Sequence, residues 1–364
     1  MKTHAIIPVF ISHRGCPNDC VFCNQKKITS RNGDVTPEDA KKTIEEWLTT
    51  LTPMRKRGLK TVEVSFFGGS FTGIPIEEQT AFLKVAKEYK DAGLIDLIHL
   101  STRPDYISPD ILDNLKAFSV DVIELGVQSF DDEVLNKSGR GHSSACVYEA
   151  CDLIKQYGFT LGIQLMIGLP GDSVSSCRYS AEETVKIGPA VARLYPTVTI
   201  RETELYEMYL RGDYQPLSPD EAVERTKIMY EILDDAGINI IRVGLKSSEI
   251  MDDEIGFHPA FRQLVESRIA RDRIEKQIIE ILDAELPDWE FYGSSGYKET
   301  DEIIPVLVTA NERSYGNMFG HQGTNRRYFS SKYPMVKIRY SKDYEQLISL
   351  SDNEYRVSID ACPR

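Results

Sequence analysis

The stretch Ala5-Ile-Ile-Pro-Val-Phe-Ile11 leads, a few residues later, into Cys16-Pro-Asn-Asp-Cys20-Val-Phe-Cys23. The apolar run predicts a buried strand, and the cysteines stand in the loop after it with the spacing C-x3-C-x2-C. Such a loop can place three thiolates around one face of an iron-sulfur cubane, which leaves the fourth iron open to another ligand. The alternative is a zinc site in which His13 supplies the fourth ligand.

Outward from this stretch, short β-branched runs alternate with longer amphipathic stretches as far as about residue 245. The alternation predicts strand-helix units around a parallel sheet. Six such units predict an α/β fold, a partial (β/α)6 barrel of the TIM type. The expected strands are 5–11, 61–67, 94–100, 120–126, 160–167 and 190–200, and the expected helices are 36–51, 76–92, 109–118, 143–157, 174–188 and 218–236.

Glycine-rich and polar motifs stand directly after the expected strands. Functional residues of such barrels lie where strands end on the carboxyl side, so we expect these motifs around one mouth of the barrel. A zinc site at the cysteines would leave them unexplained. The motifs are Gly68-Gly69-Ser70, Ser101-Thr102-Arg103, Gln128-Ser129, Gly168-Leu169-Pro170 and Arg201.

The cysteine spacing, with the aromatic Phe22 before the last cysteine, resembles the signature of the radical S-adenosylmethionine (SAM) superfamily. The resemblance implies that Cys16, Cys20 and Cys23 bind a 4Fe-4S cluster and that SAM chelates the open iron. It also implies that one-electron cleavage of SAM yields a 5′-deoxyadenosyl radical, which abstracts hydrogen from the substrate.

The same resemblance assigns the SAM-binding positions. Gly68-Gly69-Ser70 matches a glycine-rich segment in which absent side chains let backbone groups approach the methionyl ammonium. Gln128 and Arg140 are spaced as in enzymes similar to oxygen-independent coproporphyrinogen dehydrogenase, where the glutamine touches the ribose and the arginine pairs with the SAM carboxylate. Ser101 and Gln164 stand where relatives carry acidic residues. A tight turn at the glycines and a polar strand end at Gln164 are the structural alternatives.

A longer series of motifs resembles the radical SAM half of the Elongator catalytic subunit, a family that modifies wobble uridines in tRNA. That family carries an acetyltransferase domain after its barrel, whereas the residues left here are too few for one, so the same reaction is not implied. The motifs are Thr102-Arg103-Pro104-Asp105, Glu124-Leu125-Gly126-Val127-Gln128-Ser129, Arg140-Gly141-His142, Leu194-Tyr195-Pro196-Thr197 and Leu205-Tyr206-Glu207.

Composition and charge indicate which partners and which cellular compartment to expect for the chain. Its net charge of -13 by itself disfavours a nucleic-acid partner, although an average can hide a local patch. Seven cysteines without a disulfide-like spacing fit a reducing compartment. The apolar runs are far shorter than the roughly 20 residues that span a bilayer, and the start of the sequence has no secretory signal pattern. We therefore expect a cytoplasmic location and no membrane partner.

The pattern changes near residue 250, which predicts a radical SAM domain of residues 1–250 and a small α+β domain of residues 251–364. Within the second domain, the stretch from Arg313 to Lys342 carries seven Lys and Arg residues and no Asp or Glu. This basic stretch stands out in an acidic chain. It is the local patch that the net charge hides.

The stretch contains Gly320-His-Gln-Gly323 and then a helix candidate, an arrangement that resembles a KH domain, whose GxxG loop clamps single-stranded nucleic acid. Gly320 and Gly323 are expected to let phosphates approach the backbone, and Arg326 and Arg327 to neutralise them. The candidate stacking residues are Tyr315, Tyr328 and Phe329. The alternative is a basic, solvated face on a small domain.

These features predict a radical SAM enzyme, a transferase or oxidoreductase that modifies RNA such as a tRNA base. A low-potential donor such as flavodoxin or ferredoxin would supply the electron. The alternatives are a radical SAM enzyme acting on a small, porphyrin-like metabolite and a non-catalytic iron-sulfur protein that binds RNA. Tyr195 and Arg201 are candidates to face the substrate, and neither His142 nor His258 is given a proton role.

Overall fold

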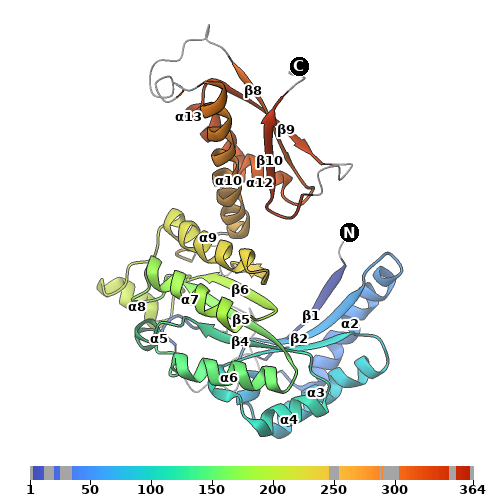
Figure 1. The fold of residues 1–364 in the computed structure, drawn as a ribbon. Helices are drawn as coiled ribbons and strands as arrows, with labels where there is room; N and C mark the ends of the chain where they lie inside the picture. Colours follow the sequence, from blue (N-terminus) through green and yellow to red (C-terminus); the bar gives the residue numbers. More distant parts are fainter. Residues whose placement is uncertain are drawn as a thin grey trace. The chain divides into compact units, whose positions relative to one another are not determined.

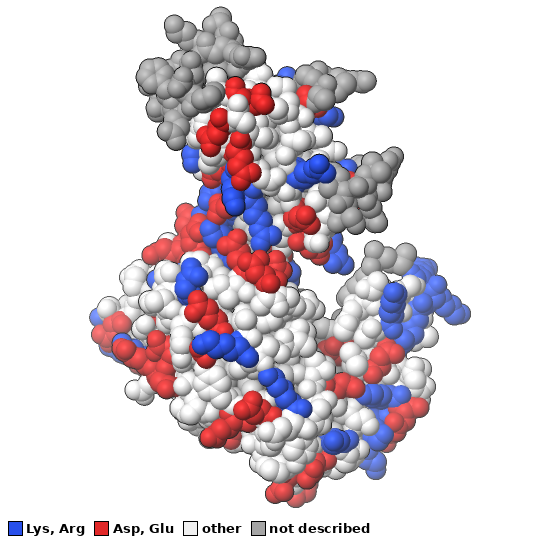
Figure 2. Space-filling model, viewed as in Figure 1, with Lys and Arg blue, Asp and Glu red and all other residues white. Residues whose placement is uncertain are grey.

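The computed structural model describes residues 3–11, 20–24, 35–245, 254–286, 289, 303–343 and 350–360. The chain divides into two compact units, Met1–Pro259 and Ala260–Arg364 (Figure 1). No helix in the described ranges is long and apolar enough to cross a membrane. On the face of the first unit that Figure 2 shows, acidic and basic side chains are interspersed, so no single acidic patch covers this face.

The first unit is built on one parallel sheet of seven strands, which neighbour one another in sequence order. Helices cover its outer face, and the sheet curls into part of a barrel (Figure 1). The expected partial α/β barrel is confirmed, with one strand more than the six expected. The strands are β1 (His4–Phe10), β2 (Thr61–Phe67), β3 (Leu97–Thr102), β4 (Val122–Gln128), β5 (Thr160–Ile167), β6 (Val191–Pro196) and β7 (Asn239–Val243).

Six of the helices in this unit correspond to the expected ones, and most begin at a Ser or Thr whose hydroxyl accepts a backbone N–H. Thr36 and Ser218 each form a capping box, followed by proline at the first helical position. The helices are α2 (Pro37–Arg55), α3 (Ile76–Asp91), α4 (Pro109–Ala117), α5 (Asp132–Lys137), α6 (Ser144–Gln156), α7 (Val174–Ile187), α8 (Glu204–Arg211) and α9 (Pro219–Asp235), with short 3-10 turns η1 (Phe71–Gly73) and η2 (Pro104–Tyr106).

The strands alternate between two faces. Ile7, Val64 and Leu100 belong to the face that packs against the helices, and all three are fully buried. The opposite, concave face carries polar side chains such as Glu63 and His99. The sheet therefore encloses a polar interior behind an apolar outer layer.

Residues just after 250 still belong to the first unit. Ile255 forms an antiparallel bridge with Thr199, and the N–H of Arg201 donates to Oε2 of Glu254 at 2.9 Å. These contacts hold the segment that follows β6, which explains why the second unit begins only at Ala260.

The second unit has a three-stranded sheet in the order β10-β8-β9, with β8 parallel to β9 and antiparallel to β10. Its core joins α10 to the sheet through Ile274, Ile278, Val306 and Val308, with Phe329 from α13. Its elements are α10 (Phe261–Glu285), β8 (Ile304–Ala310), α12 (Tyr315–Phe319), η3 (His321–Gly323), α13 (Thr324–Lys332), β9 (Val336–Lys342) and β10 (Tyr355–Ile359).

Candidate functional site

Two of the three cysteines of the motif lie in a tight turn after β1, and Cys16 and His13 lie outside the described residues. The N–H of Cys23 donates to the carbonyl of Cys20 at 2.9 Å, with Phe22 half-buried between them. The N–H of Val21 donates to Ser138 O at 3.1 Å, and Val21 O accepts from the N–H of Leu205 at 2.7 Å. The turn is thus fixed to two other segments of the barrel mouth.

Arg140 reaches this turn from the loop between α5 and α6. Its Nη1 donates to Sγ of Cys20 at 3.3 Å, and its Nη2 donates to Gly126 O at 2.5 Å. Arg103, which is ion-paired with Asp105, donates to the carbonyl of Arg140 at 2.5 Å and so fixes its backbone. Nε of Arg140 is buried without a hydrogen-bond partner among the described residues. A buried guanidinium N–H of this kind can donate to a bound anion.

Gln128 ends β4 in a left-handed conformation, with φ of 72°, which is uncommon for a residue other than glycine. Its Oε1 is buried and has no hydrogen-bond partner among the described residues. Strained backbone and an unused buried acceptor are typical of ligand sites. The side chain can accept a hydrogen bond from a ligand hydroxyl there.

Gly126 makes room for both side chains, and the sequence reasoning gave it no role. A Cβ on Gly126 would lie 3.0 Å from Nε2 of Gln128 and 3.6 Å from Nη2 of Arg140. The signal was present, because Gly126 stands inside a buried strand, where glycine often marks a close approach. A side chain at this position would displace Gln128 or Arg140.

The glycine-rich segment after β2 lies against the end of β1. Gly68 has φ of 106°, and a Cβ there would lie 3.3 Å from backbone atoms of Ile11, the residue that leads toward the cysteines. Ser70 is buried and its carbonyl accepts from the N–H of Gly73 at 2.9 Å. The glycine-rich segment therefore begins in close contact with the residue that directly follows β1.

The two remaining predicted SAM contacts are engaged with other protein groups. Ser101 donates to Phe66 O at 3.4 Å, and Nε2 of Gln164 donates to a carboxylate oxygen of Glu124. Both side chains belong to the concave face of the sheet, on β3 and β5, the two strands that flank β4. Their assignment to the SAM ribose stays a prediction.

A chain of charged side chains crosses the concave face below these residues, and the sequence reasoning missed it. Nδ1 of His99 lies 2.7 Å from Oε1 of Glu63, and Nε2 lies 3.5 Å from Oε2 of Glu124. Nε of Arg193 donates to Oε2 of Glu124 at 2.8 Å, and the Arg193 guanidinium lies 5.1 Å from the ring centroid of Phe67. Two carboxylates and two cations thus compensate one another in the barrel interior.

The compensation shifts the ionisation of each group. Although burial opposes it, hydrogen bonds and charge from Glu124 and Glu63 raise the pKa of His99 to about 9. Against the same burial, Arg193 and His99 lower the pKa of Glu124 to about 2, and contacts with His4 and His99 hold the pKa of Glu63 below its ordinary range. All of these groups therefore carry charge near neutral pH. Each stands at a polar position in an otherwise apolar strand, which is the signal that could have revealed them.

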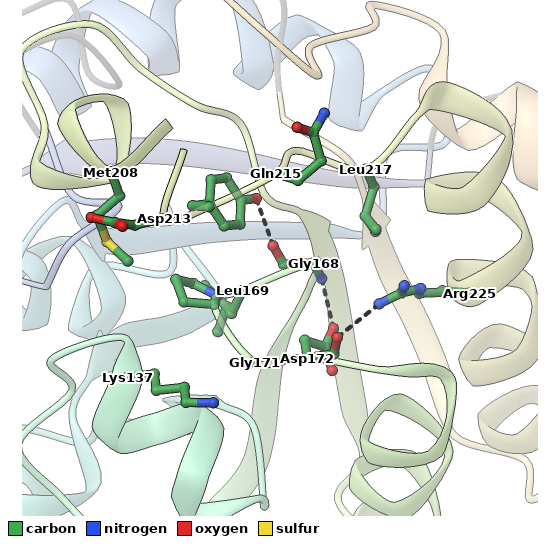
Figure 3. Close-up of a pocket in the computed structure, with 12 residues that line it drawn as sticks. Lys137, Gly168, Leu169, Gly171, Asp172, Met208, Asp213, Gln215, Leu217 and Arg225 are labelled. Carbon is green, nitrogen blue, oxygen red and sulfur yellow. Dashed lines mark hydrogen bonds between the residues drawn. The ribbon is translucent and has the colours of Figure 1, made fainter. Parts of the chain in front are cut away.

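A cavity of about 420 Å³ opens beside the end of β5, within the usual volume of small-molecule sites (Figure 3). Asp172 fixes one wall of this cavity through two hydrogen bonds. Its side-chain carboxylate accepts from the N–H of Gly168 at 2.7 Å, and its backbone carbonyl accepts from the Arg225 guanidinium at 3.1 Å. Tyr214 donates to Gly168 O at 2.7 Å. Gly168 has φ of 85°, and a Cβ there would meet Leu217 at 2.8 Å. The cavity therefore lies at the turn that follows β5.

In the second unit, the predicted RNA-contacting residues lie together. Gly320 and Gly323 bound the turn between α12 and α13, with φ of 73° and 77°. Arg327 donates to Gln322 O at 2.8 Å, and Arg326 is exposed on the same helix.

The predicted stacking residues do not share one surface. Phe329 is only 1% exposed and belongs to the core, so the stacking role given to it is wrong. The ring of Tyr328 lies 4.7 Å from the Arg271 guanidinium, and its hydroxyl donates to Glu275 at 2.7 Å. Tyr315 is half-buried on α12.

The chain is similar to known proteins in family, in sequence and in structure. The radical SAM superfamily matches residues 10–183, and the Radical_SAM C-terminal domain matches residues 189–271. The tRNA uridine(34) acetyltransferase of Methanocaldococcus infernus is 29% identical over 256 residues, which cover 60% of this chain and 48% of that protein. Human Elongator complex protein 3 is 30% identical over 185 residues, which cover 45% of this chain and 34% of that protein.

Among solved structures, the archaeal Elp3 of Methanocaldococcus infernus with an N-terminal deletion is similar with a TM-score of 0.54 and 23% identity. The match covers 69% of this chain and 62% of that one, and it supports the fold alone. The chain spans about half the length of the first curated relatives that it matches.

Proposed function

Because the chain belongs to the radical SAM superfamily, we propose that it is an enzyme that cleaves SAM reductively and modifies RNA, such as a tRNA base. The cleavage would take place at the site of Cys20, Gln128 and Arg140. Members of this superfamily use a 4Fe-4S cluster and SAM. When bound, these groups supply a one-electron cleavage that yields a 5′-deoxyadenosyl radical.

The residues at the mouth fit these groups. Cys20 and Cys23, with Cys16, would hold the cluster, since thiolates are its usual ligands. Backbone groups of Gly68-Gly69-Ser70 would meet the ammonium of SAM, and Oε1 of Gln128 would accept a hydrogen bond from a ribose hydroxyl.

The contact between Arg140 and Cys20 is the observation that carries the proposal. One guanidinium both donates to a cysteine of the motif and keeps a buried N–H without a partner among the described residues. In this position it would hold the SAM carboxylate next to the cluster, because a guanidinium pairs with carboxylates through two donors. Arg103, which is ion-paired with Asp105, keeps Arg140 in place by donating to its backbone carbonyl.

RNA is proposed as the substrate on two grounds. The sequence is similar to a protein named tRNA uridine(34) acetyltransferase. The second unit carries the turn of Gly320 and Gly323, with Arg326 and Arg327 on the helix that follows, and this arrangement fits phosphates. The barrel would make the radical and the basic unit would bind the RNA. A donor such as flavodoxin or ferredoxin would provide the electron.

The first test is anaerobic incubation of the reconstituted protein with SAM and dithionite. We expect 5′-deoxyadenosine and methionine, measured by mass spectrometry, and we expect Cys20→Ala to abolish both. Cys146→Ala is the matched control, because Cys146 is a half-buried cysteine of α6 that does not belong to the C-x3-C-x2-C motif. A protein that binds SAM but never yields 5′-deoxyadenosine would refute the catalytic proposal.

The second test concerns the substrate. Modified nucleosides from anaerobic cells with and without the protein are compared by mass spectrometry, and we expect at least one modified nucleoside to disappear with the protein. Unchanged nucleosides, together with a small metabolite that couples SAM cleavage to its own conversion, would replace RNA by the metabolite as the substrate.

A further inference from the structure

Two arginines lie side by side on the concave face of the sheet in the first unit. Arg193 on β6 pairs with Arg242 on β7 in the parallel ladder, so both side chains leave the same face of the sheet. Their neighbours Leu194 and Val243 are buried on the opposite face, against the helices. Neither arginine is fully buried. Both side chains therefore project toward the barrel interior.

A shift in strand register brings Arg242 to this face. Ala192 pairs with Ile240. The next residue of β6, Arg193, pairs with Arg242, so the ladder passes over one residue of β7. In an unshifted ladder Arg193 would pair with Ile241, and Arg242 would point toward the helices. Bulges of this kind re-aim a side chain and are common next to active sites, and this one places a second guanidinium inside the barrel.

The Arg193 guanidinium is held in place by protein groups but keeps one donor unused. Its Nε donates to Glu124 at 2.8 Å, and its Nη1 donates to the Tyr195 hydroxyl at 3.5 Å. The ring centroid of Phe67 lies 5.1 Å from the guanidinium, and this ring offers a π face but no oxygen acceptor. Nη2 is buried and has no hydrogen-bond partner among the described residues. A buried donor left in this way is costly until a ligand accepts from it.

Arg242 adds a positive charge that the neighbouring charge chain does not balance. Its Nε donates to Gly244 O at 2.9 Å, and within the described part of the chain it forms no ion pair with a carboxylate. The charge chain contains two carboxylates and two cations that compensate one another: Glu63, Glu124, His99 and Arg193. Arg242 therefore leaves one positive charge in excess beside Arg193, which favours an anionic ligand.

Tyr195 lies beside the two guanidiniums. It follows Arg193 by two residues on β6, so its side chain leaves the same face of the sheet. Burial raises the pKa of its phenol, and the charges of Arg193 and Arg242 counteract this rise. Both cations are therefore close enough to act on the hydroxyl. Since the phenol stays protonated near neutral pH, it can donate to an oxygen of the same ligand.

The arginine pair lies at the same level of the sheet as the proposed SAM site. Gly126, whose carbonyl accepts from Arg140, pairs with Gln164. Gln164 in turn pairs with Arg193. Neighbouring strands are about 4.8 Å apart, so the backbones of Gly126 and Arg193 are separated by roughly 10 Å along the sheet. A molecule held at Arg193 through one group can therefore place its remaining atoms next to SAM.

We propose that Arg193, Arg242 and Tyr195 bind a singly charged oxyanion of the substrate. The inference rests on the proposed function, which makes the molecule inside the barrel the substrate of the SAM-derived radical. A phosphodiester of RNA and a carboxylate of a small metabolite offer a guanidinium the same chemistry, namely two oxygens that share one negative charge. With RNA as the substrate, the occupant is the phosphodiester beside the reacting nucleotide, and the base extends toward SAM.

The test uses the full-length, cluster-reconstituted protein saturated with SAM, under anaerobic conditions and without a reductant, so that SAM stays intact. Calorimetry compares the binding of RNA dinucleotides, which contain one phosphodiester, with that of their methylphosphonate analogues, which keep the shape but lack the charge. Dinucleotides of adenosine, cytidine, guanosine and uridine cover the choice of base. We expect the wild type to prefer at least one charged dinucleotide over its neutral analogue by about tenfold, because the analogue loses a charged hydrogen-bonding partner.

Substitutions of the two arginines assign this preference to the site. Arg242→Gln is expected to abolish the preference for the charged dinucleotide, and Arg242→Lys, which keeps the charge, to retain it in part. Arg193→Lys keeps a cation next to Glu124 but removes Nη2, so it should also lose most of the preference. Arg178→Gln is the matched control, because Arg178 is exposed on α7. Circular dichroism checks that each variant is folded.

A second arm of the experiment, with propionate as the ligand, distinguishes the two sources of the oxyanion. If propionate binds to the wild type but not to Arg242→Gln, and the dinucleotides show no preference for charge, the site is supported and its occupant is the carboxylate of a small metabolite. A preference for charge that folded Arg242→Gln retains in full would overturn the site. The same holds if neither propionate nor the charge of a dinucleotide contributes to binding in the wild type.

The two proposals can fail separately, because these affinities are measured without cleavage of SAM. If the affinities depend on Arg242 as expected but the reduced protein never forms 5′-deoxyadenosine, the enzyme proposal alone is wrong. If 5′-deoxyadenosine forms but neither arm shows an anion at the arginine pair, the oxyanion site alone is wrong.

Discussion

Among single residues, substitution of Arg140 is expected to change both the reduction potential of the cluster and the affinity for SAM. Arg140→Ala removes the donor to Sγ of Cys20, and hydrogen bonds to cluster sulfurs raise the reduction potential, so we expect a lower midpoint potential in EPR-monitored redox titration. SAM affinity should fall about tenfold or more, because a charged hydrogen-bonding partner is lost. Arg140→Lys keeps the charge but cannot reach both Cys20 and Gly126, so it should restore affinity only in part.

Arg178→Ala provides the control for this prediction, because Arg178 is exposed on α7. Its potential and SAM affinity should equal those of the wild type. An unchanged potential in Arg140→Ala would mean that the hydrogen bond to Cys20 has no part in setting the electronic environment of the cluster.

The buried charge chain predicts a pH dependence of stability. The pKa of His99 rises from its ordinary value of 6.5 to about 9 in the folded protein. Its contribution is therefore fully present below pH 6.5 and is lost as the pH rises through 9, an effect on the order of 2 kcal/mol. Urea denaturation between these pH values should show this loss in the wild type, and His99→Gln should lack it.

His142→Gln is the matched control for that experiment. Burial and the charges of Arg140 and Arg103 lower the pKa of His142 to about 4, so it does not titrate between pH 6.5 and 9. The control should keep the wild-type slope. If His99→Gln keeps it too, the imidazole of His99 is not the group that titrates.

At the scale of elements, we expect two glycine-to-alanine substitutions near the turn between α12 and α13 to change the free energy of unfolding in opposite directions. Gly320→Ala should lower the free energy of unfolding of the second unit by about 2 kcal/mol, because a Cβ would meet Thr324 and Asn325 in a left-handed backbone. Gly316→Ala, in α12 with nothing within 4 Å of the new Cβ, should raise it by about 0.5 kcal/mol.

The fluorescence of Trp289 reports the unfolding of the second unit, since its ring lies 5.7 Å from that of the buried Tyr333. Fluorescence-monitored urea titration in a Trp47→Phe background follows Trp289 alone, because the chain has two tryptophans. Equal midpoints for Gly320→Ala and Gly316→Ala would contradict the packing argument at Gly320.

The elements differ in how far the sequence predicts them. Buried parallel strands are recognisable in the sequence as β-branched runs between capped helices, so the barrel could be predicted. β7, however, is a five-residue run that follows a left-handed Gly237, too short to separate from a turn by its pattern. The chain of Glu63, His99 and Glu124 comes from three strands, and only the register between them brings the side chains together. Long-range register is not encoded in any local pattern.

For the molecule as a whole, each unit has an apolar core of its own, so a ligand of one unit should leave the stability of the other unchanged. The second unit's core is built from α10, the sheet and α13. The cysteine turn instead depends on backbone bonds to Ser138 and Leu205 in the first unit. We therefore expect removal of the cluster to reduce the local stability of the first unit and to leave that of the second unit unchanged.

Hydrogen exchange measured by mass spectrometry on the cluster-reconstituted and the metal-free protein tests this. We expect removal of the cluster to speed exchange around residues 20–24, 135–140 and 203–206, because the turn's bonds to Ser138 and Leu205 open once thiolate ligation is lost. Peptides from β8 and α13 should exchange equally in both forms. Faster exchange in α13 to the same extent would mean that the two units unfold as one, and that the cluster stabilises the second unit as well as the barrel.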